Sequence, residues 1–511
     1  MMIEILLAVT LIGAGAVFLA PDRIAGKLAF WISLVPAAIG LWLFAAFDGS
    51  GNALLEGGEI AFESRYEWVQ FGDYAISWFV GLDGISLPLV VLTTILVTLA
   101  IVSSWTPIDE RESQFYGLVL FIEANLIGVF AALDFFLWFI FWEAVLIPMY
   151  LLIGIWGGPR RKYAAIKFFV YTNVASLVMF GAFVTLVFGL GDSVSSFALP
   201  EIAQALLAGT PDAFYGIEGT TLASVVFVAM FLGFAVKVPV VPFHTWLPDA
   251  HVEAPTPASV LLAGVLLKMG TYALLRFNFT MFPDEVIEPF LVPIAVVAVI
   301  SVIYGALLAL AQTDLKRIVA YSSVSSMGYV ILGLIALTQF GVGGATFQMV
   351  SHGLISGLMF MTVGVIYNAT HTRMVSDMSG MADRMPVAAG VFVAGAFGYM
   401  GLPLLSGFAA EYYIFFGAFQ SEVLAYAPIF TALAMFGIVL VAGYLLFAMQ
   451  RAIFGPYTLE TDYDVGRAPL HDVAPLFVLL GIIIALGVAP ELIFEMITDA
   501  VDPILETGGE L

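Results

Sequence analysis

Long apolar stretches recur along nearly the whole chain, separated by short polar segments. A stretch of about 20 apolar residues can cross the hydrocarbon core of a bilayer as an α-helix. Strand-like alternation does not recur, which argues against a transmembrane β-barrel. The pattern therefore predicts an all-α integral membrane protein with about fourteen transmembrane helices. They are expected near residues 3–20, 28–47, 82–104, 114–132, 134–156, 164–190, 220–243, 255–277, 289–311, 316–338, 341–368, 387–417, 428–454 and 473–495.

The basic residues are distributed unevenly between alternate loops. If the N-terminus is placed outside, the inner loops collect twelve of the seventeen bases, and the outer side keeps only Arg65 and Arg276. This asymmetry follows the positive-inside rule and supports an even number of helices. It predicts both termini on the periplasmic side of a bacterial cytoplasmic membrane. The twelve inner bases are Arg23, Lys27, Arg111, Arg160, Arg161, Lys162, Lys316, Arg317, Arg373, Arg384, Arg451 and Arg467.

Two of the expected helices contain interruptions. Pro239 and Pro242 lie within one turn of the seventh helix, and Gly401, Pro403 and Gly407 interrupt the twelfth. Such prolines are either ordinary kinks of membrane helices or, as a pair five helices apart, the sign of an inverted-repeat transporter. The second interpretation predicts two inverted five-helix repeats. The chain then divides into N-terminal helices at 1–113, a first repeat at 114–277, a second repeat at 289–454, and a final helix with an acidic tail at 473–511.

Composition supports a membrane protein and excludes several other classes. Of the 511 residues, 61% are hydrophobic and 11% are charged, whereas soluble domains have about 25% charged residues. The net charge of −22 leaves no basic stripe for nucleic acid. Because cysteine is absent, disulfides and Fe–S clusters within this chain are excluded. The acidic residues are interpreted as solvated surface, mainly in loops 48–77 and 191–219 and in the tail after residue 495.

Two ionisable residues in the first half fall at mid-membrane depth. Glu143 lies midway along the fifth helix, and Lys237 lies beside the interruption of the seventh. A charge at the centre of a membrane helix costs roughly 2.5–3.5 kcal/mol, so it faces protein or a wet cavity. Burial and a nearby carboxylate shift the pKa of a lysine in opposite directions, which would make this pair a tunable proton donor. The alternative for Glu143 is a protonated carboxyl hydrogen-bonded to a neighbouring helix.

Three further candidates lie in later helices. Lys268 is midway along the eighth helix, where the alternative is snorkelling to the interface. His352 is central in the eleventh helix, and it suits either a proton relay or a structural hydrogen bond. Glu411 follows the interruption of the twelfth helix and is its only acidic residue. Together with Glu143 and Lys237, these residues are the predicted proton relay.

Five residues are weaker candidates. Glu123 and Asp134 are either relay members, helix-interface partners or interfacial acids, and Lys316 is either a relay residue or a positive-inside anchor. His244 and His251 are seven residues apart, a spacing that could suggest a metal site. No third ligand is obvious and cysteine is absent, so hydrogen bonding to a helix end or cavity wall is the favoured interpretation. No metal is expected.

Three segments carry a resemblance to a known family. Residues 237–270 begin Lys-Val-Pro-Val-Val-Pro-Phe-His-Thr-Trp-Leu-Pro-Asp-Ala-His, and residues 141–150 read Phe-Trp-Glu-Ala-Val-Leu-Ile-Pro-Met-Tyr. Residues 315–329 read Leu-Lys-Arg-Ile-Val-Ala-Tyr-Ser-Ser-Val-Ser-Ser-Met-Gly-Tyr. The chain resembles, over essentially its whole length, the antiporter-like subunits of respiratory complex I and the Mrp cation/proton antiporters.

Within that family the chain is most similar to the M-type subunits of bacterial NADH:quinone oxidoreductase. Glu411 stands where L- and N-type subunits usually carry lysine, and the chain ends soon after its fourteenth expected helix. The resemblance implies a proton channel in which Glu143 and Lys237 are coupled, Lys268 and His352 are central, and Glu411 is the exit residue.

The same resemblance implies L- and N-type subunits as partners. NADH, FMN, Fe–S clusters and quinone would bind in the wider complex, with no cofactor on this chain. The open alternatives are an Mrp-type Na⁺/H⁺ antiporter subunit and a membrane subunit of a hydrogenase complex.

Overall fold

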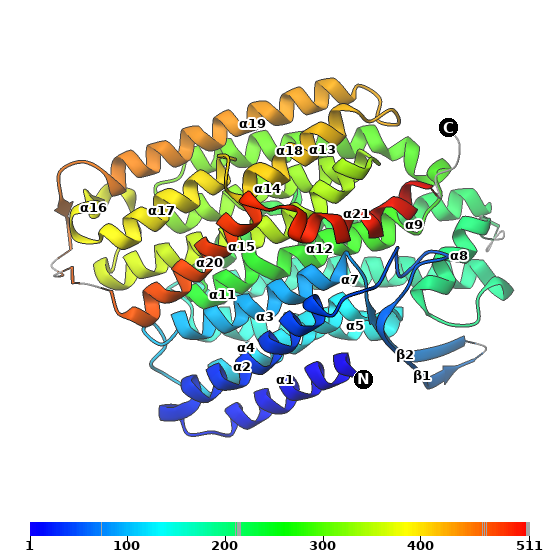
Figure 1. Cartoon of the computed structure of the whole chain (residues 1–511), viewed down its shortest axis with the longest axis horizontal. Helices are drawn as coiled ribbons and strands as arrows, with labels where there is room; N and C mark the ends of the chain where they lie inside the picture. Colours follow the sequence, from blue (N-terminus) through cyan, green and yellow to red (C-terminus); the bar gives the residue numbers. More distant parts are fainter. Residues whose placement is uncertain are drawn as a thin grey trace.

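The computed structural model describes residues 1–506 except 73, 210, 212–215, 462, 464 and 467, so the expected inner base Arg467 lies outside the described residues. The chain forms a bundle of helices that run side by side along the longest axis (Figure 1). Because lipid offers no hydrogen-bond partners, the apolar segments satisfy their own backbone groups as helices. The helices of the first half are α1 (Met2–Phe18), α2 (Asp22–Ala45), α3 (Ser86–Ser103), α4 (Glu112–Ala131), α5 (Phe135–Ala144), α6 (Leu146–Trp156), α7 (Arg161–Leu190), α8 (Leu199–Ala208), α9 (Gly219–Lys237) and α10 (Trp246–Glu253).

The second half is built in the same way. It continues the bundle and adds two π-helical segments around α12. Its helices are α11 (Thr256–Leu261), α12 (Leu267–Ala273), α13 (Asp284–Leu310), α14 (Leu315–Ile335), α15 (Gln339–Thr370), α16 (Met381–Arg384), α17 (Pro386–Tyr399), α18 (Ser406–Phe419), α19 (Ala427–Ala448), α20 (Leu470–Val488) and α21 (Glu491–Glu506).

The membrane-spanning prediction is confirmed at the level of fold class. Twelve helical segments among the described residues are long and apolar enough to cross a membrane. Helix α1 is shorter, with 17 residues, and the twelfth expected helix is present as α17 and α18, each of 14 residues. The exact count of fourteen and the two inverted repeats remain predictions.

Both expected helix interruptions are present. Helix α9 ends at Lys237, and the chain passes Pro239 and Pro242 before it turns into the short α10. Helices α17 and α18 are separated by residues 400–405. A third irregularity was not expected: π-helical segments at Leu262–Leu266 and Leu274–Phe279 flank α12. Single-turn π segments in helices often mark functional sites.

Two regions expected to be solvated polar loops are structured, which corrects the sequence interpretation. Strands β1 (Ala61–Phe71) and β2 (Tyr74–Leu82) form an antiparallel hairpin that begins in the first region and extends beyond it to Leu82. Helix α8 occupies the second region, and Ala75 N donates to Ser195 O at 2.9 Å, which joins the two regions. They lie at one end of the bundle, here called the hairpin end (Figure 1). An isolated hairpin among charged residues gives a weak sequence signal, because strand propensity depends strongly on context.

The acidic tail also contains a helix, α21, over Glu491–Glu506. Helix α21 is amphipathic and packs against α15, so its apolar stripe is buried while its acidic residues remain on the other face. The acidic residues of the tail were expected to be solvated surface, and those of α21 lie outside its buried stripe. The buried residues of α21 are Ile493, Ile497, Ala500, Val501 and Ile504.

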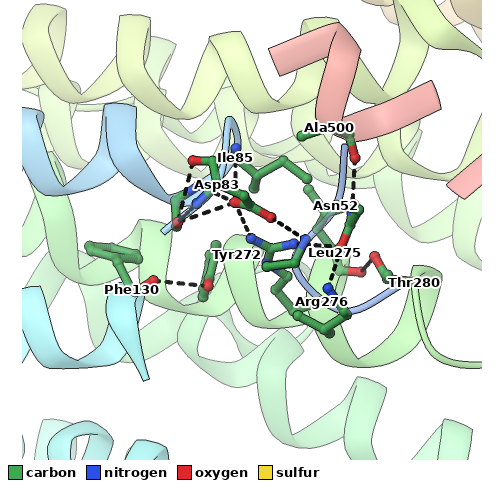
Figure 2. A network of polar contacts seen from close by, with 12 residues as sticks. Asn52, Asp83, Ile85, Phe130, Tyr272, Leu275, Arg276, Thr280 and Ala500 are labelled. Atoms are coloured by element: carbon green, nitrogen blue, oxygen red, sulfur yellow. Dashed lines mark hydrogen bonds and ion pairs between the residues drawn. The ribbon is translucent and has the colours of Figure 1, made fainter. Parts of the chain in front are cut away.

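A buried ion pair joins three parts of the chain at the hairpin end (Figure 2). Arg276, on the second π segment, pairs through Nη2 with Asp83 and donates through Nη1 to Asn52 Oδ1 at 3.1 Å. Asn52 donates to Ala500 O of α21 at 2.9 Å. Arg276 was expected on the outer side; it lies at the hairpin end but is only 1% exposed.

Burial raises the pKa of Asp83, but the charge and hydrogen bonds of Arg276, with backbone donors, outweigh burial and hold that pKa below its ordinary value. A carboxyl with a lowered pKa in the folded state contributes stability above its unfolded pKa and loses it as pH falls through the lowered value. The Asp83–Arg276 pair is therefore fully charged at neutral pH.

We expect Arg276→Met to destabilise the protein more than the double substitution Asp83→Asn/Arg276→Met. Removing only the guanidinium leaves a buried carboxylate without its cation, and breaking a buried pair in this way costs about 3–5 kcal/mol. The double variant leaves no unpaired charge. Thermal unfolding of the purified protein, followed by intrinsic fluorescence, compares the two. An equal loss of stability would show that the unpaired charge is not the main cost.

Candidate functional site

Lys268 and His352 contact each other in the interior of the bundle. Lys268 Nζ lies 2.6 Å from His352 Nδ1 and donates to Ala263 O at 2.5 Å. Lys268 is 0% exposed and His352 is 1% exposed. A lysine ammonium can only donate, so Nδ1 of a neutral imidazole accepts in this contact. The snorkelling alternative for Lys268 does not describe this geometry.

Two glycines allow this contact. Lys268 follows the π segment Leu262–Leu266, and His352 lies on α15. The two elements cross at Gly264 and Gly353, where a Cβ added to Gly353 would lie 2.7 Å from the carbonyl oxygen of Gly264. Any larger side chain at that crossing would push the backbones apart and lengthen the contact between lysine and histidine.

Lys237 and Glu143 lie in one region but form no salt bridge within 4.0 Å among the described residues. Lys237 ends α9, and its Nζ lies 4.1 Å from the ring centre of Trp142. A desolvated cation–π contact contributes about 2 kcal/mol. Glu143, the next residue on α5, interacts electrostatically with Lys237. Trp142 is therefore a contact residue that sequence reasoning missed, because an aromatic residue in an apolar helix gives no distinctive signal.

Glu143 has an incomplete set of hydrogen bonds. Its Oε2 accepts from Asn173 Nδ2 at 3.3 Å, whereas its buried Oε1 has no partner among the described residues. Glu143 is half-buried, unlike the fully buried Lys237 and Lys268. Asn173, on α7, is a second residue that the sequence did not single out. The alternative of a carboxyl hydrogen-bonded to a neighbouring helix describes the Asn173 contact.

Glu411 lies buried in α18, soon after the interruption that separates it from α17. Its Oε2 has no hydrogen-bond partner among the described residues. Gly401 faces this carboxyl with a φ of +65°, and a Cβ at Gly401 would overlap Glu411 Oε2. The helix interruption thus makes the space that the carboxyl occupies, and glycine is the residue that adopts this φ without strain.

The weaker acidic candidates have different environments. Glu123 is 0% exposed, and neither carboxyl oxygen has a partner in the described structure. Asp134 caps α5 by accepting from the amides two and three residues onward, and it also accepts from Ser77 N of β2 at 2.9 Å. Asp314 caps α14 in the same manner. The structure thus gives Asp134 a structural role, and its relay role remains a prediction.

The weaker basic candidates are His244 on the 3₁₀ turn Phe243–Thr245, His251 on α10 and Lys316 at the start of α14. His251 is buried and stacks on Phe360 with ring centroids 4.5 Å apart, and neither ring nitrogen has a described partner. It interacts electrostatically with Lys268 and with Lys316, whose Nζ donates to a backbone carbonyl at 2.7 Å. His244 Nδ1 is likewise unpartnered. Within the described ranges, no cluster of three His, Cys, Asp or Glu residues could hold a metal ion.

Acidic residues of α10 connect helices at the end opposite the hairpin, here called the basic end. Asp249 accepts from Lys167 Nζ at 2.8 Å and from Arg317 Nη2 at 3.2 Å, which ties α10 to α7 and α14. Glu253 accepts from Arg160 N at 2.8 Å. The partners in these contacts are 68 or more residues apart in the sequence, so no local pattern could reveal them.

These features define a multi-pass membrane protein whose functional groups are buried ionisable side chains on separate helices. The chain belongs to the family described as NADH:quinone oxidoreductase/Mrp antiporter, TM, which matches residues 132–437. The resemblance inferred from the three sequence segments is therefore confirmed at family level.

Similar proteins extend the match over the full chain. F(420)H(2) dehydrogenase subunit M of Methanosarcina mazei is 38% identical over 99% of this chain and 98% of its own length. NADH-quinone oxidoreductase subunit M of Rhodobacter capsulatus is 39% identical over 98% of this chain and 93% of its own length.

Solved structures have the same fold. A chain of respiratory complex I from Thermus thermophilus with bound NADH has a TM-score of 0.86 and 26% identity, with 100% of both chains covered. A chain of the Mrp complex from Dietzia sp. has a TM-score of 0.83 with 99% of both chains covered, but at 21% identity it shows the fold alone.

We expect Gly353→Ala to reduce proton uptake by inverted membrane vesicles. The added Cβ would separate α15 from Gly264 and lengthen the contact between Lys268 and His352, at a cost of about 1–3 kcal/mol for overpacking. Gly181→Ala is the matched control, because nothing lies within 4 Å of a Cβ at that position of α7. Equal proton uptake by the two assembled variants would mean that proton transfer does not depend on the distance between α15 and the backbone at Gly264.

Proposed function

We propose that this chain is a proton-translocating membrane subunit of a complex I-type oxidoreductase. The observation that carries the proposal is the contact between Lys268 Nζ and His352 Nδ1 at 2.6 Å. Lys268 forms no salt bridge with a carboxylate in the described structure, so only neutral acceptors hold its ammonium. A buried lysine held in this way can give up its proton at modest cost, because no ion pair has to be broken.

In the proposed relay, Glu143 and Lys237 form the coupled pair. A negative Glu143 stabilises a charged Lys237, and a neutral Glu143 leaves that ammonium with only the ring of Trp142 nearby. Charges interact far more strongly in a low-dielectric interior than in water, so a change at Glu143 is felt at Lys237 without contact. Protonation of Glu143 therefore favours release of a proton by Lys237, and in the proposed relay this proton moves on toward Lys268.

Orientation follows from the two ends of the bundle. The basic end carries Arg160, Arg161, Lys162 and Arg317, and by the positive-inside rule it faces the cytoplasm. The hairpin end faces outward and holds both terminal helices, since Glu4 of α1 lies beside strand β1 and Asp499 of α21 accepts from Gly51 N. The chain lies in the cytoplasmic membrane with L- and N-type subunits as neighbours.

The redox chemistry belongs to partner subunits. NADH, FMN and Fe–S clusters would bind there, since a chain without cysteine supplies no thiolate ligands. The names of the relatives give two electron donors, F(420)H(2) and NADH. The proposed proton route is compatible with either donor, because either would be oxidised on partner subunits.

Glu143→Gln should nearly abolish donor-driven proton uptake in an assembled complex, whereas Glu143→Asp should retain part of it. Glutamine keeps the shape and the contact with Asn173 but cannot change its charge. Proton uptake by inverted vesicles measures the effect, and a native gel checks assembly. Wild-type uptake by the Gln variant would remove Glu143 from the relay.

Glu411→Gln should also stop proton uptake in an intact complex, because the amide cannot accept and release a proton. Glu411→Lys should keep some activity, since the family resemblance implies lysine at this position in L- and N-type subunits. Proton uptake by inverted vesicles measures the activity of both variants, and a native gel checks their assembly. If assembled Glu411→Gln takes up protons as the wild type does, the exit route lies elsewhere.

Na⁺/H⁺ exchange without electron transfer is the second candidate, favoured by the fold shared with the Mrp complex. Purification of the chain with its native partners separates the two functions. Co-purifying flavin and Fe–S subunits would support the proposal, and a set of small membrane subunits without redox groups would contradict it.

A further inference from the structure

A cavity outside the proposed relay lies at the basic end, where α16, the start of α17 and the start of α20 meet (Figure 1). Its volume is about 600 Å³. Helix α16 directly precedes α17, and α17 packs against α20. None of the five main relay residues is among the described residues that line the cavity, so the proposed relay gives it no role. The lining residues include Asp383, Arg384, Pro386, Val387, Leu470 and Val473.

The apolar wall of the cavity lies at the end of a membrane-spanning helix. Helix α20 is long and apolar enough to cross a membrane, and Leu470 is its first residue. Leu470 is 81% exposed, and Val387, near the start of α17, is 43% exposed. At the end of a spanning helix, apolar side chains that the protein leaves uncovered are in contact with lipid chains. This wall therefore fits the acyl part of a lipid.

The polar side of the cavity holds a guanidinium without a carboxylate partner. Arg384 forms no salt bridge within 4.0 Å among the described residues, and its side chain donates no hydrogen bond to them. Its Cζ lies 4.9 Å from the ring centre of Tyr457, a contact that holds the side chain in place. A guanidinium presents a planar fork of N–H donors that matches the oxygens of a phosphate.

The backbone adds positive partial charge at the same place. The first N–H groups of a helix have no partner within that helix, and they form the positive end of its dipole. Helix α17 begins at Pro386 and α20 begins at Leu470, and neither start has a side-chain cap. Both residues line the cavity. An anion in the cavity would meet two helix starts in addition to the guanidinium.

Two carboxyls oppose an anion here. Asp383 lines the cavity beside Arg384 and forms no salt bridge among the described residues. Asp472, in the first turn of α20, is buried, and its carboxyl accepts from Thr106 Oγ1 at 2.8 Å. One guanidinium and two helix starts therefore face a single exposed carboxylate, and this balance favours an anion.

We infer that this cavity binds the headgroup of an anionic phospholipid, an inference that does not depend on the proton relay. The guanidinium of Arg384 and the starts of α17 and α20 contact the phosphate, and the acyl chains lie along Val387, Leu470 and Val473. Basic pockets between spanning helices on the cytoplasmic side bind anionic headgroups in this way. A zwitterionic headgroup adds an ammonium, which the guanidinium and the helix starts repel. A free phosphate would leave the apolar wall uncovered.

Photo-crosslinking tests the inference in the complex purified with its native partners. The probe is phosphatidylglycerol that carries a diazirine in one acyl chain, and the labelled residues are identified by mass spectrometry. In the wild type, this probe should label residues 386–388 and 470–473 several-fold more than the matching phosphatidylcholine probe does. Equal labelling by the two probes would overturn the inference.

Variants of the two charged residues give opposite expectations. Arg384→Gln should lower the labelling of residues 386–388 and 470–473 by phosphatidylglycerol several-fold, and Asp383→Asn should raise it. Arg451→Gln is the matched control and should label as the wild type does. Arg451 is also exposed at the basic end, and its Cζ lies 3.9 Å from the ring centre of Phe447, but it does not line the cavity. Wild-type labelling of assembled Arg384→Gln would contradict the inference.

If Arg384→Gln does not assemble, competition in the wild-type complex decides instead. An excess of unlabelled phosphatidylglycerol should displace the probe, whereas phosphatidylcholine and inorganic phosphate should not. Equal displacement by the two lipids would show that headgroup charge plays no part. Displacement by inorganic phosphate would show a phosphate site without a role for the acyl chains. Either result overturns the inference.

Discussion

The high cost of placing a charge inside a membrane-spanning bundle governs the rest of this structure. Lys268 is wholly buried, and its ammonium is satisfied by a backbone carbonyl and by His352, at 2.5 Å and 2.6 Å. A carboxylate partner would hold the proton more strongly. Neutral acceptors lower the cost of the charge and still allow it to leave. The close crossing at Gly264 and Gly353 allows this short contact, because neither residue places a side chain between the two backbones.

The chain contains two kinds of buried cation, which differ in their partners. One kind is paired with a carboxylate and has a structural role, and the other kind has no carboxylate partner and belongs to the proposed proton relay. Arg276 is paired with Asp83, and a guanidinium does not lose its proton in proteins, so this charge is permanent and fastens the hairpin end to α21. Lys237 and Lys268 are held by an aromatic ring and by an imidazole. In the proposed relay their charges are exchangeable, because no ion pair fixes them in the described structure.

Irregular backbone is concentrated where the ionisable residues lie. The end of α9 carries Lys237, the first π segment precedes Lys268, and the gap between α17 and α18 makes room for Glu411. Irregular backbone at membrane depth persists only where protein or a wet cavity surrounds it. In a bundle whose other spanning helices are largely regular, these irregular segments bring polar groups and unpartnered side chains to the interior.

The sequence by itself determined the membrane class, the positions of the spanning segments and the five main relay candidates. Each of these is a local property, since an apolar stretch or an isolated charge within it can be recognised from its neighbours. Only the tertiary structure decided the partners. His352 lies 84 positions from Lys268, and Trp142 looks like an ordinary apolar-helix residue. Asp83 falls at the start of the third expected helix, where nothing in the local sequence singles it out. The physical reason is that local sequence shows the cost of burying a charge, whereas the group that offsets this cost lies on another helix, at a distance set by how the helices cross.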